Sequence, residues 1–296
     1  MKLIAAIKQQ RWWIVGGAIL LAIIVGLAAI PGLCAAGDAR FCTAILWKLM
    51  PTSAFTGLMK GGINALVALG LVLIYKSSQV FNFAQGQLVM IGAFITWSLM
   101  VQVGLPFGLA LILGLAGIVL LSLLIERLAL RPLTGQPILS TILMTLALGQ
   151  ILLGLNFLVW GGARQVFPEQ LVSAFQQCPL PGLENCRVSL GSFYVPIVLR
   201  PILLWSFVVA TGMVIAFALF FQFTKTGLAM RATAENHRLA QSVGLRVPRI
   251  FATAWGISGV IALAGGILLG IISGVDAVNL AFTGLLAFPA VLLGGP

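Results

Sequence analysis

The sequence predicts an all-α protein, a polytopic bundle of about eight transmembrane helices. Hydrophobic residues make up 60% of the chain and charged residues only 8%, whereas a soluble domain carries about 25% charged residues. Charge-free runs of about 20 residues, the length that crosses a bilayer as a helix, recur along the chain. Six acidic and seventeen basic side chains cannot cover a core of this size, so lipid is the expected solvent.

Each expected span is an apolar run between charged or turn-forming residues. The run 77–125 is too long for one helix, and the turn formed by Gly104 and Pro106 divides it in two. The other expected spans are residues 12–31, 55–75, 138–160, 202–223, 250–272 and 279–293.

The Lys and Arg residues predict the orientation. Short cytoplasmic loops hold them in excess, and most of them fall inside if the N-terminus is cytoplasmic. The net charge of +11 is spread over loops, so anionic lipid is the expected counterpart and no nucleic acid is predicted. The first run is longer than a signal-peptide core, so we interpret it as a retained anchor; a signal peptide cleaved near Cys34 is the alternative.

Two predicted outer loops carry the four cysteines. Cys34 and Cys42 lie in one, and Cys178 and Cys186 lie in the other, within the long loop 161–200. An oxidising compartment permits disulfides there, although sequence cannot choose among three connectivities and unpaired thiols remain the alternative. No histidine accompanies them, so no metal site is predicted. The loop 161–200 is either a cap or docking surface, or a tolerated insertion.

Several motifs resemble one transporter family, the permease subunits of branched-chain amino-acid ABC importers. They are residues 64–71 (NALVALGL), 80–88 (VFNFAQGQL), 227–232 (GLAMRA), 262–266 (ALAGG) and 287–295 (AFPAVLLGG). The family often has His where Gln85 stands, which puts an imidazole role there in doubt. It also usually continues past Gly294 and Gly295, so the sequence is expected to be a truncated permease.

The resemblance implies a single permease domain, residues 1–296, in the bacterial inner membrane. It also implies a second related permease subunit, two cytoplasmic ATP-binding subunits and a periplasmic solute-binding protein. Members carry branched-chain or other neutral amino acids, or urea and short amides. The chain has no Gly-x-x-x-x-Gly-Lys-Ser/Thr string, so we expect a non-enzymatic subunit without a cofactor, with ATP used by its partners.

The loop 225–249 is basic and amphipathic. The resemblance implies that it couples the permease to the ATPase, through Glu235, Arg238, Ala240 and Gly244. An interfacial helix held against anionic lipid is the alternative.

Amide side chains gather at the start of the third predicted span. Asn82, Gln85 and Gln87 could point from an unwound or re-entrant segment toward the solute path. Amides suit an uncharged or zwitterionic solute. They could equally join helices by hydrogen bonds, and Asn64, Gln150 and Asn156 share that ambiguity.

Three glycines repeat every four residues near the seventh predicted span. Gly266, Gly270 and Gly274 could form a face that packs closely on another helix, in this chain or in a partner permease. In so glycine-rich a chain, chance spacing is the alternative.

Two other function classes compete with this interpretation. An ion-coupled secondary transporter or channel needs ionisable groups deep in the membrane, and Lys60 and Glu126 are expected at span ends. An intramembrane protease is suggested by Gly256-Ile257-Ser258-Gly259, but the single histidine, His237, lies in a predicted cytoplasmic loop, out of reach as a base.

Overall fold

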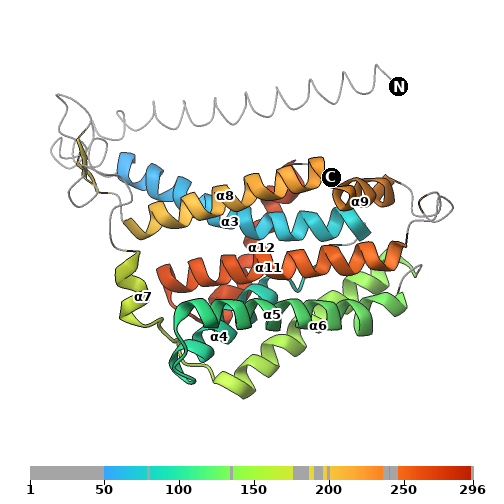
Figure 1. The fold of residues 1–296 in the computed structure, drawn as a ribbon, viewed down its shortest axis with the longest axis horizontal. Helices are drawn as coiled ribbons and strands as arrows, with labels where there is room; N and C mark the ends of the chain where they lie inside the picture. The colour runs from blue at the N-terminus through green and yellow to red at the C-terminus, as the bar shows by residue number, and fades with distance from the viewer. Residues whose placement is uncertain are drawn as a thin grey trace, which may run out of the picture. The chain divides into compact units, whose positions relative to one another are not determined.

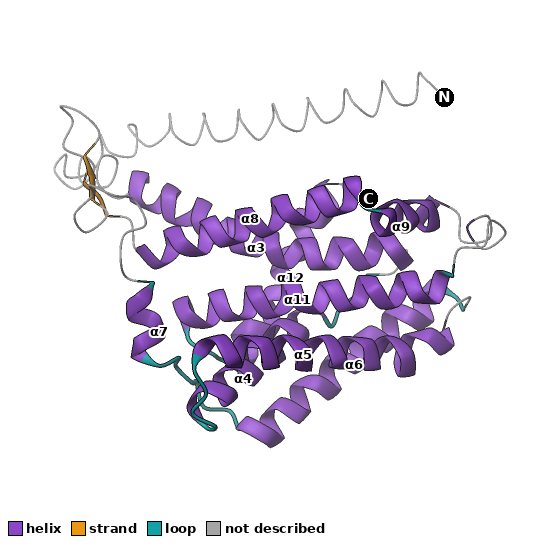
Figure 2. Cartoon of the chain, viewed as in Figure 1, coloured by secondary structure: helices purple, strands orange, loops and turns teal. Residues whose placement is uncertain are grey.

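The chain forms a bundle of long apolar helices (Figures 1 and 2). The computed structural model describes residues 50–78, 81–133, 136–175, 187–189, 196–198, 201–235, 240 and 246–294. The long helices are α3 (Met50–Ser78), α4 (Gln85–Val101), α5 (Phe107–Ile125), α6 (Ile138–Trp160), α8 (Pro201–Phe223), α11 (Val247–Ser273) and α12 (Ala277–Gly294). The shorter ones are the π-helix η2 (Glu126–Leu130), the 3-10 helix η3 (Arg131–Leu133), α7 (Glu169–Ala174) and α9 (Lys225–Glu235).

The structure also describes two short strands. β1 (Arg187–Ser189) pairs antiparallel with β2 (Pro196–Val198). They belong to a different compact unit from residues 56–186 and 199–296.

The predicted polytopic helical bundle is confirmed. Within the described residues, five helices are long and apolar enough to cross a membrane, those built on α3, α5, α6, α8 and α11, while α4 and α12 are apolar but shorter. The predicted span 138–160 coincides with α6. The predicted first span lies outside the described residues.

Helix α11 lies at the centre of the bundle because its small residues admit close neighbours. Gly92 of α4 approaches so closely that an added Cβ would lie 2.9 Å from the Cα of Leu263. An added Cβ at Gly266 would meet the carbonyl oxygen of Val89. Without a hydrophobic force between helices in lipid, such close backbone packing is a main source of association.

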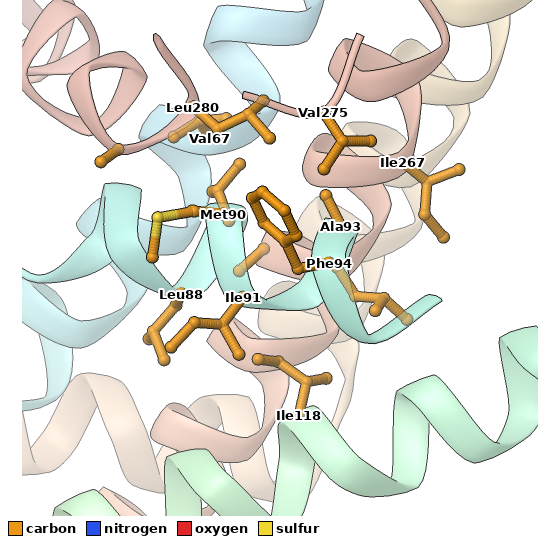
Figure 3. Packing of buried hydrophobic residues seen from close by; sticks show 14 of the residues in the cluster. Val67, Leu88, Met90, Ile91, Ala93, Phe94, Ile118, Ile267, Val275 and Leu280 are labelled. Carbon is orange, nitrogen blue, oxygen red and sulfur yellow. The ribbon is translucent and has the colours of Figure 1, made fainter. Parts of the chain in front are cut away.

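Two clusters of buried side chains pack on α11. The first joins α11 to α4, α5 and α12 and includes Phe94, whose ring lies between α4 and its neighbours in Figure 3. The second joins α11 to α3, α8 and α9 through Leu66, Ala210 and Met230, all 0% exposed.

Helices α3 and α11 bring basic residues to the same end of the bundle. Gly70 of α3 lies beside Ser258 of α11, and Val67, three residues earlier in the chain, lies beside Gly265, further along α11. Helix α3 therefore runs antiparallel to α11. Its last turn, with Lys76, consequently lies toward the beginning of α11, where Arg249 stands.

The opposite end of α11 is covered by the described beginning of the loop 161–200. Gln165 and Val275 exchange backbone hydrogen bonds of 2.9 and 2.8 Å, and Phe167 is buried against Gly270. The Trp97 indole N–H donates to the Val166 carbonyl at 3.0 Å. This part of the loop is thus fastened to α4 and α11.

Candidate functional site

A break in helical structure separates α3 from α4. Residues 81–84 are not helical, and the Asn82 side chain stabilises this turn because its Oδ1 accepts the Ala84 backbone N–H at 3.0 Å. The Gln85 N–H donates to the Asn82 carbonyl at 3.3 Å. The third span therefore begins later than the apolar run predicts, after an unwound segment.

The first residue of α4 joins three helices through one buried polar network. Gln85 Oε1 accepts the Ser258 hydroxyl of α11 at 2.9 Å and the Asn82 amide at 3.3 Å. The same hydroxyl lies 3.1 Å from the Gly70 carbonyl of α3. Asn82, Gln85 and Ser258 are each 0% exposed. In this conformation the network fastens helices together and is closed on all sides.

The network lies deep in the bundle. Ser258 is the twelfth residue of the 27-residue helix α11, so at 1.5 Å per residue it stands about 16 Å from the start of a helix about 40 Å long. Helix α4 therefore begins near mid-depth. Irregular backbone at this depth is tolerated where protein buries it or where it lines a water-filled cavity.

Several buried amide atoms of α4 and α6 have no hydrogen-bond partner among the described residues. They are Gln85 Nε2, Gln87 Oε1 and both polar atoms of Asn156. Gln87 is half-buried beside Gly149 of α6, where an added Cβ would lie 3.2 Å from its Cδ. A buried amide without a partner costs about 1–3 kcal/mol, so these atoms would gain from a polar solute or water that reached them.

Aromatic rings line the other side of the break. Tyr75 stacks on Phe81 with centroids 4.3 Å apart, and Phe83 stacks on Phe288 of α12 at 4.6 Å. Phe81 and Phe288 approach to 5.4 Å. All four rings are half-buried, so apolar and amide surfaces meet at the beginning of α4.

Two buried polar residues, Ser258 and Asn156, could not be assigned to this region from the sequence. Ser258 was considered only for a protease motif, yet its hydroxyl serves the Gln85 network. Asn156 was one of three ambiguous amides; it is 0% exposed, whereas Gln150 is exposed. The spacing of three and four residues from Thr145 through Gly149 and Leu152 to Asn156, one face of a helix, is the signal that could have indicated its burial.

The predicted coupling loop 225–249 begins as helix α9. The Thr224 hydroxyl accepts the Gly227 backbone N–H at 3.0 Å, a side-chain N-cap. Met230 is 0% exposed in the cluster with α3, α8 and α11. Arg231 donates to the Gln222 carbonyl at 3.2 Å and lies over the Phe221 ring. Helix α9 is thereby held to the end of α8.

The predicted coupling residues are only partly described. Glu235 is the last residue of α9, and Ala240 is 5% exposed. Arg238 and Gly244 lie outside the described residues. So do the four cysteines considered for disulfides, which are Cys34, Cys42, Cys178 and Cys186.

The three predicted packing glycines do not form one helical face. Gly266 lies against α4 of the same chain, and an added Cβ at Gly270 would lie 2.7 Å from the Phe167 ring. Gly274 follows the last residue of α11 with φ of +78°. Including Gly274 was wrong, because the four-residue spacing continues past the end of the helix.

Placing Glu126 at a span end was also wrong. The helix continues through η2 to Leu133, and Glu126 is 4% exposed. A π-helix at this point cannot be recognised from an apolar run.

Comparison with known proteins places the chain in a family. The family model described as "Branched-chain amino acid transport system / permease component" matches residues 53–296. No solved structure matches the chain significantly.

Curated relatives agree with the family match. The chain is 27% identical over 253 residues to the high-affinity branched-chain amino acid transport system permease protein LivH of Escherichia coli (strain K12), covering 81% of this chain and 77% of the relative. It is 29% identical over 250 residues to the permease protein BraD of Pseudomonas aeruginosa, with the same coverage. A probable branched-chain amino acid transport permease protein LivH of Methanocaldococcus jannaschii is 35% identical over 207 residues, 69% of this chain and 61% of the relative.

A match over most of the chain, together with the apolar helices, identifies a multi-pass membrane protein. The chain belongs to the family of permease components of branched-chain amino acid transport systems.

Proposed function

We propose that this chain is a permease subunit of an ATP-driven importer that moves branched-chain or other neutral amino acids across the bacterial inner membrane. The family match over residues 53–296 is the observation that carries the proposal. The names of the relatives, which describe branched-chain amino acid transport, support this solute class. Urea and short amides are the other solutes considered.

The interior of the bundle suits a solute without net charge. Glu126 is the one acidic residue in helices α3 to α6, α8, α11 and α12 with their extension η2. The unpartnered amide atoms of Gln85, Gln87 and Asn156 offer both donors and acceptors. We assign Asn82, Gln85 and Gln87 to the solute path, with the Gln85 network breaking and reforming as the path opens.

The basic end of the bundle is assigned to the cytoplasm. Among the described residues, Lys76, Arg127, Arg131 and Arg249 stand in helix ends or short helices at that end. An excess of such residues is typical of cytoplasmic loops. The N-terminus is then cytoplasmic, and the segment fastened across Val275 faces the periplasm.

Helix α9 is assigned to coupling. It lies at the basic end and packs on α8 and α11 through Met230. A movement of a bound cytoplasmic ATP-binding subunit would therefore be transmitted to both helices. We assign ATP binding to the partner subunits and not to this chain. Two ATP-binding subunits, a second related permease and a periplasmic solute-binding protein complete the importer.

Co-purification from the native membrane tests the proposed assembly. After gentle detergent extraction, mass spectrometry of the material bound to the tagged chain is expected to find an ATP-binding subunit and a second permease. A chain that purifies alone, or as a homo-oligomer that moves solute without ATP, contradicts the proposal.

Two substitutions test coupling separately. Glu235→Ala and Gly244→Asp are expected to abolish ATP-dependent uptake while the chain still inserts and folds. Glu169→Ala is the matched control, since Glu169 is exposed on α7 at the opposite end of the bundle. Normal uptake by both loop variants would remove the coupling assignment.

A further inference from the structure

A row of exposed leucines on α5 and its extension η2 leads to two arginines. Leu120, Leu124 and Leu128 are 70%, 52% and 66% exposed. They are four residues apart, so they lie on one side of the helix. Arg127 and Arg131 each come seven residues, about two turns, after one of these leucines, and both arginines are exposed. We call these five residues the α5 stripe.

The α5 stripe has the length of one leaflet of a bilayer. The continuous apolar helix Phe107–Leu133 has 27 residues, so Leu120 stands at its midpoint. At 1.5 Å per residue, Arg127 lies about 10 Å and Arg131 about 16 Å from that midpoint. When the helix is centred in the membrane, the hydrocarbon core ends about 15 Å from the same point. The leucines therefore lie at the depth of lipid tails, and the arginines reach the depth at which headgroups begin.

Basic charge exceeds acidic charge where the stripe ends. Arg131 and Arg127 act electrostatically on Glu126, but that side chain is 4% exposed and its Oε1 accepts no hydrogen bond. The elements that pack on η2 are α5, η3, α6 and α11, and none of them carries an acidic residue. Helix α11 adds another exposed arginine, Arg249, in its first turn. One buried carboxyl thus faces three exposed guanidinium groups at this end.

The combination of leucines and arginines suits a phospholipid with a net negative charge. A guanidinium group donates paired hydrogen bonds to a phosphate, and its planar geometry fits that group better than an ammonium does. Exposed leucines in a membrane are solvated by acyl chains. Helices α6 and α8 also expose apolar side chains, but neither carries a charged residue. The α5 stripe therefore differs from these two lipid-facing surfaces by offering a place for a headgroup.

We propose that the α5 stripe binds one anionic phospholipid. Its phosphate accepts hydrogen bonds from Arg131 and Arg127, and an acyl chain lies along the three leucines toward the middle of the bilayer. A zwitterionic lipid is bound less well, because its headgroup brings a cation to a surface that is already basic. The bound lipid supplies the missing negative charge where η2 contacts α6 and α11.

Native mass spectrometry of the full chain measures this binding directly. Phosphatidylglycerol and phosphatidylcholine with the same acyl chains are added to the detergent-solubilised chain, and the affinity for the first bound lipid is compared. Because each arginine near the surface adds to the attraction, phosphatidylglycerol is expected to bind about tenfold more tightly. Equal affinity for the two lipids would overturn the proposal.

Substitution of the two arginines locates the preference. The double change of Arg127→Gln and Arg131→Gln is expected to make the affinities for the two lipids equal. Arg164→Gln is the matched control, since Arg164 is also exposed but lies beside Gly274, at the opposite end of α11, and this variant should keep the preference. A preference that survives the double change would overturn the proposal.

Photolabelling keeps the proposal testable if the double variant fails to fold. Phosphatidylglycerol with a photoreactive group on one acyl chain is added to the unchanged chain in lipid nanodiscs. Label is expected to concentrate at residues 120–128 and to be displaced by unlabelled phosphatidylglycerol but not by phosphatidylcholine. Label spread evenly over α5, α6 and α8 would show general solvation by lipid and would overturn the site.

The acidic surface of a partner subunit is the alternative occupant of the arginines. Photolabelling is therefore repeated in the native membrane, before the chain is extracted with its partners. Label at residues 120–128 supports the lipid site. Absence of that label, when the isolated chain is labelled there, would assign the arginines to a partner subunit instead. None of these measurements requires transport or ATP, so the lipid site and the proposed importer function fail separately.

Discussion

Helices α8 and α11 look alike in hydropathy but have opposite places in the bundle. Both are long and apolar enough to span a membrane. In an 18-residue apolar stretch of each helix, however, 61% of α11 is buried and only 17% of α8. Leu219 and Phe223 of α8 are exposed. Helix α11 instead carries Gly259 and Gly266, which admit α5 and α4.

The difference shows what apolar content cannot decide. In lipid, a Leu on a helix surface is solvated as well by tails as by protein, so hydropathy does not select the inner helix. Small residues and hydrogen-bonding side chains do select the inner helix, because close contact between helices stabilises them. Substitutions at matched positions of the two helices therefore test this difference.

The largest effect is expected for a single added methyl group. Gly266→Ala would place a Cβ against the Val89 carbonyl oxygen, whereas a Cβ at Gly212 of α8 would meet nothing within 4 Å. Overpacking costs about 1–3 kcal/mol, while Ala in an open helix position is favoured over Gly by about 0.5–1 kcal/mol. Thermal unfolding in detergent should show a lower midpoint for Gly266→Ala and an equal or higher one for Gly212→Ala. Equal shifts of the same sign would refute the close packing of α11 on α4.

A smaller effect is expected from buried hydroxyls. Ser258→Ala removes the link between α11 and Gln85, and we expect a loss of about 1–2 kcal/mol because a buried acceptor loses its donor. Ser206→Ala on α8 is the matched control, since Ser206 is also buried but donates to Ile202 of its own helix. Unfolding midpoints that fall equally in both variants would show that the Gln85 network does not hold the helices together.

The smallest effect is expected where α4 contacts residues 165–167, the segment that we assign to the periplasmic side. Trp97→Phe removes the indole hydrogen bond to Val166, worth about 0.5–1.5 kcal/mol. Trp160→Phe is the control, because Trp160 contributes a ring contact with Phe94 at 5.4 Å that phenylalanine can keep. Hydrogen exchange at residues 165–167 should rise in Trp97→Phe and stay unchanged in Trp160→Phe. The reverse pattern would mean that ring packing, and not the indole N–H, fastens this segment.

The spans could be predicted from the sequence because apolar length is a local property. The run 138–160 coincides with α6, and the amides at Asn82 and Gln85 correctly signalled an unwound start to the third span. The partners of those amides could not be predicted, since Ser258 lies 173 residues from Gln85. The burial of Glu126 was missed because a charge after an apolar run ordinarily marks a helix end, and the π-helix that keeps it inside has no sequence pattern.

ATP-dependent uptake tests the central claim, that this chain is the membrane path of an importer. The assembly purified with this chain is reconstituted in proteoliposomes, with its binding protein outside, ATP inside and a radiolabelled branched-chain amino acid as solute. The account predicts uptake that stops when ATP is replaced by a non-hydrolysable analogue and that Glu235→Ala abolishes. Uptake by this chain alone, driven by an ion gradient and indifferent to ATP, would contradict it.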